Sequence, residues 1–182
     1  MNIFTQNYSR LNGDSIDDLL ELCNECFPVK YSRDNIRGLL INSNIYTSGV
    51  IVSNKLVGFV MGSSKFFSDV LEEDLTQKNE FTQLPRHSKI SYLMLLGVTN
   101  SYRRQKLGSF LLDQYITWAK SQGSQAIYLH THSYNLSALE FYRNHGFLVS
   151  HEIPAFYHFD DAEQPALMMY KILNCEEPSL MR

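Results

Sequence analysis

The spacing of apolar residues changes along the first part of the chain from helical to strand-like. Residues 14–26 and 32–42 carry apolar side chains at helical spacing, which predicts two helices. From residue 45 onward the chain becomes β-branched and aromatic, which predicts strands over 45–53 and 56–66. The short Asn54-Lys55 connection between them is typical of a β-hairpin.

The second half of the chain alternates between strands and helices. In order, a strand, a helix, a strand, a helix and two strands are predicted over residues 89–98, 104–121, 125–131, 135–144, 147–152 and 166–173. This alternation predicts an α/β fold. Before it lies the polar segment 68–87, which carries a cluster of acidic residues, and we expect a partly mobile loop there.

Composition narrows the class of protein. The chain has 182 residues, 44% of them hydrophobic, which favours one domain over residues 1–174 and a short tail over 175–182. The net charge of −3 predicts no nucleic-acid partner, and no apolar stretch approaches the ~20 residues of a transmembrane helix. Three cysteines and no signal peptide favour a reducing, cytoplasmic setting.

A basic turn between a predicted strand and a predicted helix is the main chemical signal. Arg103, Arg104 and Lys106 lie where the helix begins, and Gly108 follows within its first turn. Unpaired N–H groups at a helix start, together with these cations, favour a pyrophosphate site. The turn lacks the glycine patterns of the P-loop and the dinucleotide fold. From these residues alone, a solvated basic helix start is an equally good interpretation.

Neither the cysteines nor the histidines predict a metal site. Cys23 and Cys26 form a CxxC pair on an apolar helical stripe, which favours core packing. His130 and His132 share one face of a strand, but no third ligand is placed by spacing. No cysteine is expected near the proposed chemistry, so a covalent acyl-cysteine intermediate is not predicted.

Two motifs resemble those of the GCN5-related acetyltransferases. Arg103-x-x-Lys106-x-Gly108 is similar to the acetyl-CoA pyrophosphate loop, [Arg/Gln]-x-x-Gly-x-[Gly/Ala], with Lys106 in place of the first glycine. Residues 135–147 resemble the Asn-x-x-Ala-x-x-Phe-Tyr-x-x-x-Gly-Phe stretch of the same family. The resemblance implies acetyl-CoA as the acetyl donor and a mixed, twisted sheet of about seven strands flanked by about four helices.

Within this family, three further segments resemble the N-terminal methionine acetyltransferases of the NatE and NatF type. They cover residues 27–31, 90–98 and 126–130, and the likeness extends over most of residues 3–173. It implies transfer of acetyl to the α-amine of Met-starting peptides, directly within a ternary complex. Auxiliary acetyltransferase subunits are possible partners.

The resemblance assigns roles to individual residues. Tyr92 and His130 would take the proton of the acceptor amine through a held water, and Tyr142 would protonate the departing thiolate. The implied acetyl-CoA site consists of Leu95, Leu96, Val98, Arg103, Arg104, Lys106, Gly108, Ser109, Asn135 and Tyr142. The implied peptide site consists of Phe27, Pro28, Val29, Tyr31, Tyr92, Phe156 and Tyr157. Asn135 is also a predicted helix cap.

Several alternatives stay open at the level of sequence. Tyr92, His130 and Tyr142 are equally readable as core residues. Lys30 either selects acidic side chains near the start of the peptide or is simply solvated. The protein as a whole is then an N-terminal acetyltransferase, an acetyltransferase for lysine or small amines, or a non-catalytic acetyl-CoA-binding scaffold.

Overall fold

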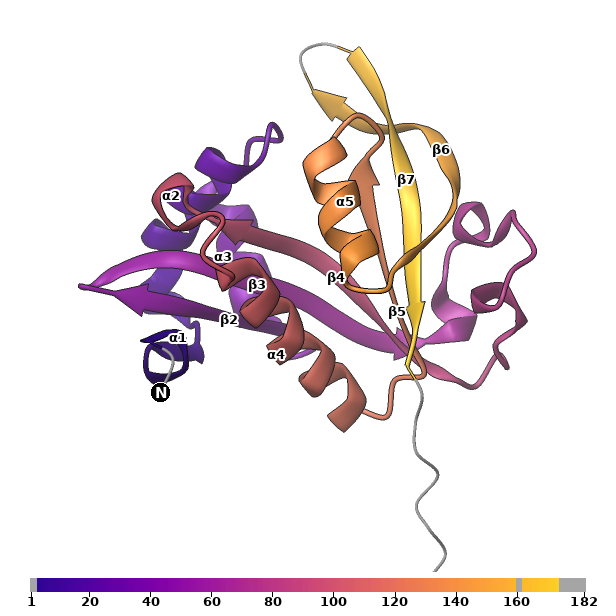
Figure 1. Ribbon diagram of the computed structural model, residues 1–182, viewed down its shortest axis with the longest axis horizontal. Coiled ribbons are helices and arrows are strands. Elements are labelled where there is room, and N and C mark those ends of the chain that lie inside the picture. The colour runs from indigo at the N-terminus through magenta and orange to yellow at the C-terminus, as the bar shows by residue number, and fades with distance from the viewer. Residues whose placement is uncertain (1–2, 160–161, 174–182) are drawn as a thin grey trace, which may run out of the picture.

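In the computed structural model, which describes residues 3–159 and 162–173, every strand pairs into one mixed sheet (Figure 1). The strand order across the sheet is β1-β2-β3-β4-β5-β7-β6. The strands are β1 (Tyr8–Arg10), β2 (Ile45–Val52), β3 (Lys55–Phe66), β4 (Lys89–Val98), β5 (Ala126–His132), β6 (Leu148–Phe159) and β7 (Ala162–Ile172). The helices are α1 (Ile3–Gln6), α2 (Ile16–Cys26), α3 (Arg33–Ile41), α4 (Leu107–Ser121) and α5 (Leu136–Asn144). The predicted tail over 175–182 lies outside the described residues.

Apolar side chains on both faces of the sheet are buried under helices. Residues of α4 and α5 pack with one face of the sheet around Leu111, Tyr115 and Leu139. Residues of α2 and α3 pack on the other face around Leu19 and Ile36. The predicted α/β class and the helical stripes of α2 to α5 are therefore confirmed.

Two short elements were not predicted, and several element boundaries differ from the predictions. α1 and β1 were not predicted, because four and three residues are too short to show a period. β6 extends to Phe159 instead of ending at 152, with register shifts and a positive φ of 55° at Ala155. β6 pairs with β7 through backbone groups while most of its side chains stay outside the core, so it carries no apolar pattern.

The central strands β4 and β5 separate soon after they start. They pair in parallel at Ile90–Ala126, Ser91–Ile127 and Tyr92–Tyr128, and beyond these positions they diverge, as Figure 1 shows. Beyond Tyr92, the backbone of β4 on this side has no neighbouring strand. The sheet therefore opens into a V-shaped gap at its centre.

Gly62 packs closely against Tyr115 at the base of this gap. The β3–β4 register shifts between Met61 and Gly62, and the buried Tyr115 hydroxyl donates a hydrogen bond of 2.8 Å to the Tyr92 carbonyl. That carbonyl is thus satisfied by a side chain of α4 at the point where the strands part. Only a residue without Cβ fits at position 62, because a Cβ would overlap the Tyr115 hydroxyl.

The polar segment 68–87 is packed rather than loose, contrary to expectation. It forms the short 3₁₀ helices Phe67–Asp69, Glu72–Leu75 and Phe81–Gln83, beside the start of β4 and the second half of β7 in Figure 1. Its apolar side chains Val70 and Phe81 are buried against Tyr128 and Tyr170 of the sheet. These few apolar residues are spaced too irregularly to show a period, so composition alone predicted a loop.

Within residues 3–159 and 162–173, no helix has both the length and the apolar character needed to cross a membrane.

Replacing Gly62 by Ala should destabilise the fold. The added methyl group would overlap Tyr115 and lie 2.5 Å from the Tyr92 carbonyl oxygen, so we expect a loss of about 2–3 kcal/mol in the free energy of unfolding. Urea denaturation measures this change. Gly38→Ala is the matched control, since no atom lies within 4 Å of its Cβ position in α3, and it should gain about 0.5–1 kcal/mol. Equal stability of the two variants would contradict the assigned packing.

Candidate active site

A large cavity of about 1180 Å³ occupies the gap between β4 and β5. Every residue assigned a role from the sequence lines it: Phe27, Pro28, Val29, Tyr31, Tyr92, Leu95, Leu96, Val98, Arg103, Arg104, Lys106, Gly108, Ser109, His130, Asn135, Tyr142, Phe156 and Tyr157. These residues come from the turn after α2, the strands β4, β5 and β6, the basic turn with the first turn of α4, and both ends of α5. The fold thus brings together residues separated by up to 130 positions, and their individual roles remain predictions.

The basic turn before α4 adopts a left-handed backbone. Arg104 and Lys106 have φ angles of 62° and 66°, and α4 begins at Leu107 instead of the predicted residue 104. Residues with positive φ cannot continue a right-handed helix, which explains the late start. Lys106 thus adopts the left-handed backbone conformation that glycine favours, although it carries a side chain.

The first turn of α4 presents backbone donors to the cavity. The first intrahelical bond runs from the Phe110 N–H to the Lys106 carbonyl at 3.0 Å, so the three N–H groups before it have no helical partner. Gly108 and Ser109, which carry two of them, line the cavity beside the basic turn. Together the N–H groups and the three cations form a site suited to a pyrophosphate.

Side chains next to this turn are held in place by hydrogen bonds. The His145 Nδ1–H donates to the Phe141 carbonyl at 2.7 Å, so Nε2 accepts from the Ser109 hydroxyl at 3.0 Å. The Asn135 side chain accepts from the Ala138 N–H at 3.1 Å, which confirms the predicted cap of α5. Ser109 is therefore left with its backbone N–H as the group available to a ligand.

The end of α2 braces the loop that precedes the basic turn. The Glu25 carboxylate accepts from the Thr99 hydroxyl at 3.0 Å and from the Asn100 N–H at 2.7 Å. The Cys26 thiol and the Arg103 Nε–H both donate to the Val98 carbonyl, at 3.5 and 3.0 Å. Sequence spacing gave no sign of the contacts of Glu25 and Cys26, which join positions more than 70 residues apart.

The expectation that no cysteine lies near the chemistry is wrong. Cys26 is half-buried and lines the cavity, while Cys23 is fully buried in the core as predicted. Burial raises the pKa of the Cys26 thiol, which keeps it protonated and a weak nucleophile. Its hydrogen bond to Val98 gives it a structural role, and a covalent acyl-cysteine step has no support.

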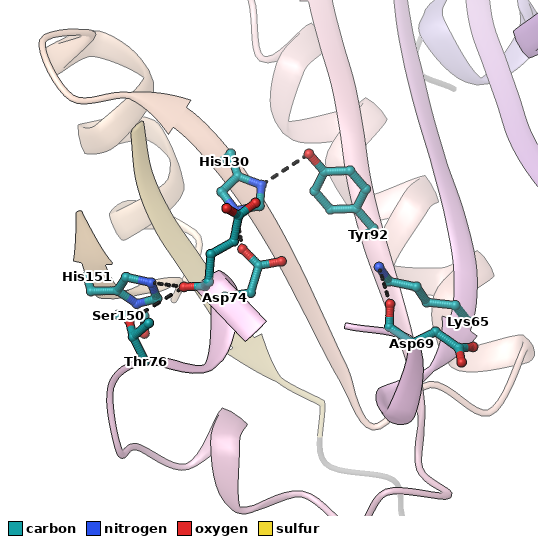
Figure 2. Close-up of polar contacts among 9 residues, drawn as sticks. Lys65, Asp69, Asp74, Thr76, Tyr92, His130, Ser150 and His151 are labelled. Carbon is teal, nitrogen blue, oxygen red and sulfur yellow. Dashed lines mark hydrogen bonds and ion pairs between the residues drawn. The ribbon is translucent and has the colours of Figure 1, made fainter. Parts of the chain in front are cut away.

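Tyr92, His130 and Asp74 form a hydrogen-bonded chain, in which Tyr92 and His130 line the cavity and Asp74 is buried behind them (Figure 2). His130 Nε2 lies 2.7 Å from a carboxylate oxygen of Asp74, and the side chains of both residues are at most 5% exposed. A carboxylate can only accept, so Nε2 carries the hydrogen and Nδ1 accepts from the Tyr92 hydroxyl at 3.1 Å. Asp74 thereby fixes both the tautomer and the orientation of the imidazole ring.

Among these hydrogen-bonded side chains, the Tyr92 oxygen is the atom that remains available to contact a ligand. Both ring nitrogens of His130 are engaged, and its ring stacks on Phe156 with centroids 4.3 Å apart. Burial, aided by nearby Tyr157 and Asp74, raises the pKa of Tyr92, so the side chain remains a phenol at neutral pH. The predicted shared water between Tyr92 and His130 is thus replaced by a direct contact between the two side chains.

Asp74 is the functional residue that sequence reasoning missed. It belongs to the acidic cluster of segment 68–87, but nothing in the sequence distinguishes it from its neighbours Glu72 and Glu73. Its position is fixed by the fold, because the His151 Nε2–H donates to the Glu73 carbonyl at 2.7 Å. His151 in turn accepts from the Ser150 hydroxyl at 2.9 Å, as Figure 2 shows.

Aromatic side chains line the other half of the cavity. Phe27 packs edge-on against Tyr31 and Phe59, with centroids 6.3 Å apart in both pairs, and Tyr157 packs edge-on against Phe156 at 4.8 Å. On the same side of the gap, the His132 Nε2–H donates to the Gln164 amide oxygen at 3.2 Å. In the part of the chain that the structure describes, no group of three His, Cys, Asp or Glu residues is arranged to hold a metal ion. The aromatic side chains make this half of the cavity apolar, so an apolar side chain of a ligand can pack there.

Comparison with known proteins identifies relatives of this chain. Residues 14–147 match the model of the acetyltransferase (GNAT) family. The chain is 27% identical over 168 residues to N-alpha-acetyltransferase 60 of Xenopus tropicalis, covering 91% of this chain and 69% of that protein. It is 29% identical over 147 residues to N-alpha-acetyltransferase 60 of Danio rerio, covering 79% of this chain and 60% of that protein. The chain thus spans less than two thirds of the second relative.

A solved structure shares the fold. The crystal structure of Arabidopsis thaliana NAA60 in complex with acetyl-CoA superposes with a TM-score of 0.80 at 17% identity, covering 92% of this chain and 98% of that one. At this identity the similarity concerns the fold alone.

Replacing Lys106 by Gly should stabilise the protein. Glycine adopts a positive φ without a steric penalty, so we expect the free energy of unfolding to rise by about 1 kcal/mol in urea denaturation. Lys120→Gly is the control: it lies in the right-handed last turn of α4 and should lose about 1 kcal/mol. A destabilised K106G protein would contradict the left-handed conformation at this position.

Proposed function

The chain belongs to the GNAT acetyltransferase family, and we propose that it transfers acetyl from acetyl-CoA to the α-amine of peptides that begin with Met. The observation that carries this proposal is that one cavity holds both an anion site and a buried Tyr–His–Asp chain. An anion site alone would serve any nucleotide-like ligand. Transfer of acetyl to an amine also requires a nearby group that accepts a proton, and the Tyr–His–Asp hydrogen bonds provide one.

Acetyl-CoA fits the half of the cavity between β4 and α4. Its pyrophosphate would lie on the first turn of α4, between Arg103, Arg104 and Lys106. The pantetheine amides would pair with backbone groups of Leu95, Leu96 and Val98, as strands pair with each other. Beyond Tyr92, β4 has no paired strand on the β5 side, which leaves that side open to an extended ligand. Asn135 and Ser109 border the same path.

The acceptor amine would enter the other half, beside Tyr92. A peptide α-amine has an ordinary pKa of about 8, so it needs only a mild proton acceptor near neutral pH. As the nitrogen bonds to the acetyl carbon, its proton would pass to the Tyr92 oxygen while the Tyr92 proton moves to His130 Nδ1. The resulting imidazolium would be stabilised by the Asp74 carboxylate 2.7 Å away.

The departing thiolate needs a proton donor, and in this proposal Tyr142 would supply it. Tyr142 lines the cavity at the start of the cofactor path, and burial raises its pKa, so the hydroxyl retains its proton at neutral pH. Transfer from Tyr142 to sulfur would release the thiol without a covalent enzyme intermediate. Loss of the His130 proton to solvent and uptake of a proton from solvent by Tyr142 would then restore the starting state.

The apolar wall supports the choice of a Met-starting acceptor. Phe27, Pro28, Val29 and Tyr31 offer aromatic and aliphatic surface to the first side chain. An unbranched thioether fills such a pocket well and makes favourable contacts with aromatic rings. The names of the two relatives, both N-alpha-acetyltransferase 60, support an α-amine over a lysine side chain.

The setting of the protein is also part of this proposal. We place it in the cytoplasm as one catalytic domain over residues 1–174, with auxiliary subunits as possible partners. The free thiols Cys23 and Cys26 support a reducing compartment.

Short peptides test the proposal directly. Incubation with acetyl-CoA and peptides beginning Met-Leu or Ser-Leu, each with a free or a blocked α-amine, should acetylate only the free Met-starting peptide, as measured by mass spectrometry. Acetylation of lysine in blocked peptides would indicate the lysine class instead. Binding of acetyl-CoA without transfer to any amine would favour a scaffold.

Replacing Asp74 by Asn should lower kcat about 10–100-fold with little change in the peptide KM. The amide keeps the volume but removes the negative charge that stabilises protonated His130. Steady-state kinetics measure the split between kcat and KM. Asp69→Asn is the matched control, because the Asp69 side chain is exposed and bonded to Ser68 rather than to His130. A D74N enzyme with unchanged kcat would exclude the proposed proton path.

A further inference from the structure

We propose that Lys30 makes this enzyme prefer acceptors with an acidic side chain at the second or third position. The inference rests on the proposed function, since it concerns the peptide that follows the acetylated Met. It identifies a class of substrate and a specificity-determining residue outside the proton path.

Lys30 lies in the wall that would receive the acceptor. It lines the cavity directly between Val29 and Tyr31, and its side chain is exposed to solvent. The first side chain of a peptide bound beside Phe27 would occupy the apolar surface. The residues after it would leave the cavity beside Lys30, whose exposed side chain could reach them.

The positive charge of Lys30 is not compensated within the described part of the chain. Its ammonium group has no carboxylate within 4.0 Å there. The nearby Arg33 pairs with Asp17, and Arg37 lies 4.0 Å from Asp34. A ligand carboxylate is therefore the partner that Lys30 can gain when a peptide binds.

The other groups in this half of the cavity add little negative charge. Asp34 lines the cavity too, but its carboxylate faces Arg37 across 4.0 Å and is largely exposed. Tyr31 and Tyr157 stay neutral, because burial raises the pKa of both phenols. His132 donates to the amide oxygen of Gln164. The Lys30 ammonium group would thus attract an acidic side chain of the acceptor and repel a basic one.

Peptides that differ at one position test this inference. Peptides beginning Met-Glu, Met-Gln and Met-Lys, identical after the second residue, should be acetylated in that order of kcat/KM, and the same substitutions at the third position give a second series. At low salt the ratio between Glu and Lys should be about tenfold, because an exposed pair is attractive in one case and repulsive in the other. The ratio should shrink at 0.5 M salt, as expected of a screened interaction.

Variants of Lys30 identify the origin of the preference. Lys30→Gln should bring the Glu to Lys ratio near one, and Lys30→Glu should invert it. Lys120→Glu is the matched control, because it makes the same change of charge at the far end of α4, away from the cavity lining. Thermal unfolding of all variants checks that the fold is intact.

The outcomes separate this inference from the proposed function. If the wild-type enzyme acetylates Met-starting peptides and K30E leaves the ratio unchanged, the role of Lys30 is refuted and the proposed function stands. The same holds if K120E shifts the ratio as much as K30E does. If no Met-starting peptide is acetylated, the proposed function fails and this inference fails with it.

Discussion

The separation of β4 from β5 is the constraint on which the rest of the structure depends. Two parallel strands that stayed paired would use their backbone groups on each other and leave no space between them. Here pairing ends at Tyr92 and Tyr128, and the cavity lies beyond that point. The unpaired side of β4 is then both the floor of the cavity and a row of hydrogen-bonding groups for an extended ligand.

Opening a sheet at its centre leaves backbone N–H and C=O groups without strand partners. Side chains from α2, α4 and the basic turn hydrogen-bond two of these carbonyl groups. The Tyr115 hydroxyl satisfies the Tyr92 carbonyl, which requires a glycine at position 62. At the far end of β4, Cys26 and Arg103 both bond the Val98 carbonyl. The gap is thus held open by contacts at each end, with the chemistry between them.

The buried Asp74 carboxylate, in the polar segment 68–87, orients the side chains of the proposed proton path. Segment 68–87 covers the sheet with a few apolar side chains and inserts Asp74 beside His130. A buried charge is tolerated only where it is hydrogen-bonded, and His130 supplies that partner. The Asp74 carboxylate fixes the tautomer of His130, and His130 in turn orients the Tyr92 hydroxyl. The Tyr92 oxygen is then the atom that faces the cavity.

The sequence by itself determined the α/β class, the four main helices, the basic turn at the start of α4 and the residues that line the cavity. These follow from periodicity and from motifs whose residues are close together in the chain. It did not determine Asp74, the Glu25 and Cys26 brace or the left-handed turn at Lys106. Asp74 and His130 are 56 positions apart, and Glu25 and Asn100 are 75 apart. Such contacts have no local pattern, because they exist only once the sheet has brought distant segments together; which carboxylate of an acidic cluster is buried is decided by tertiary packing alone.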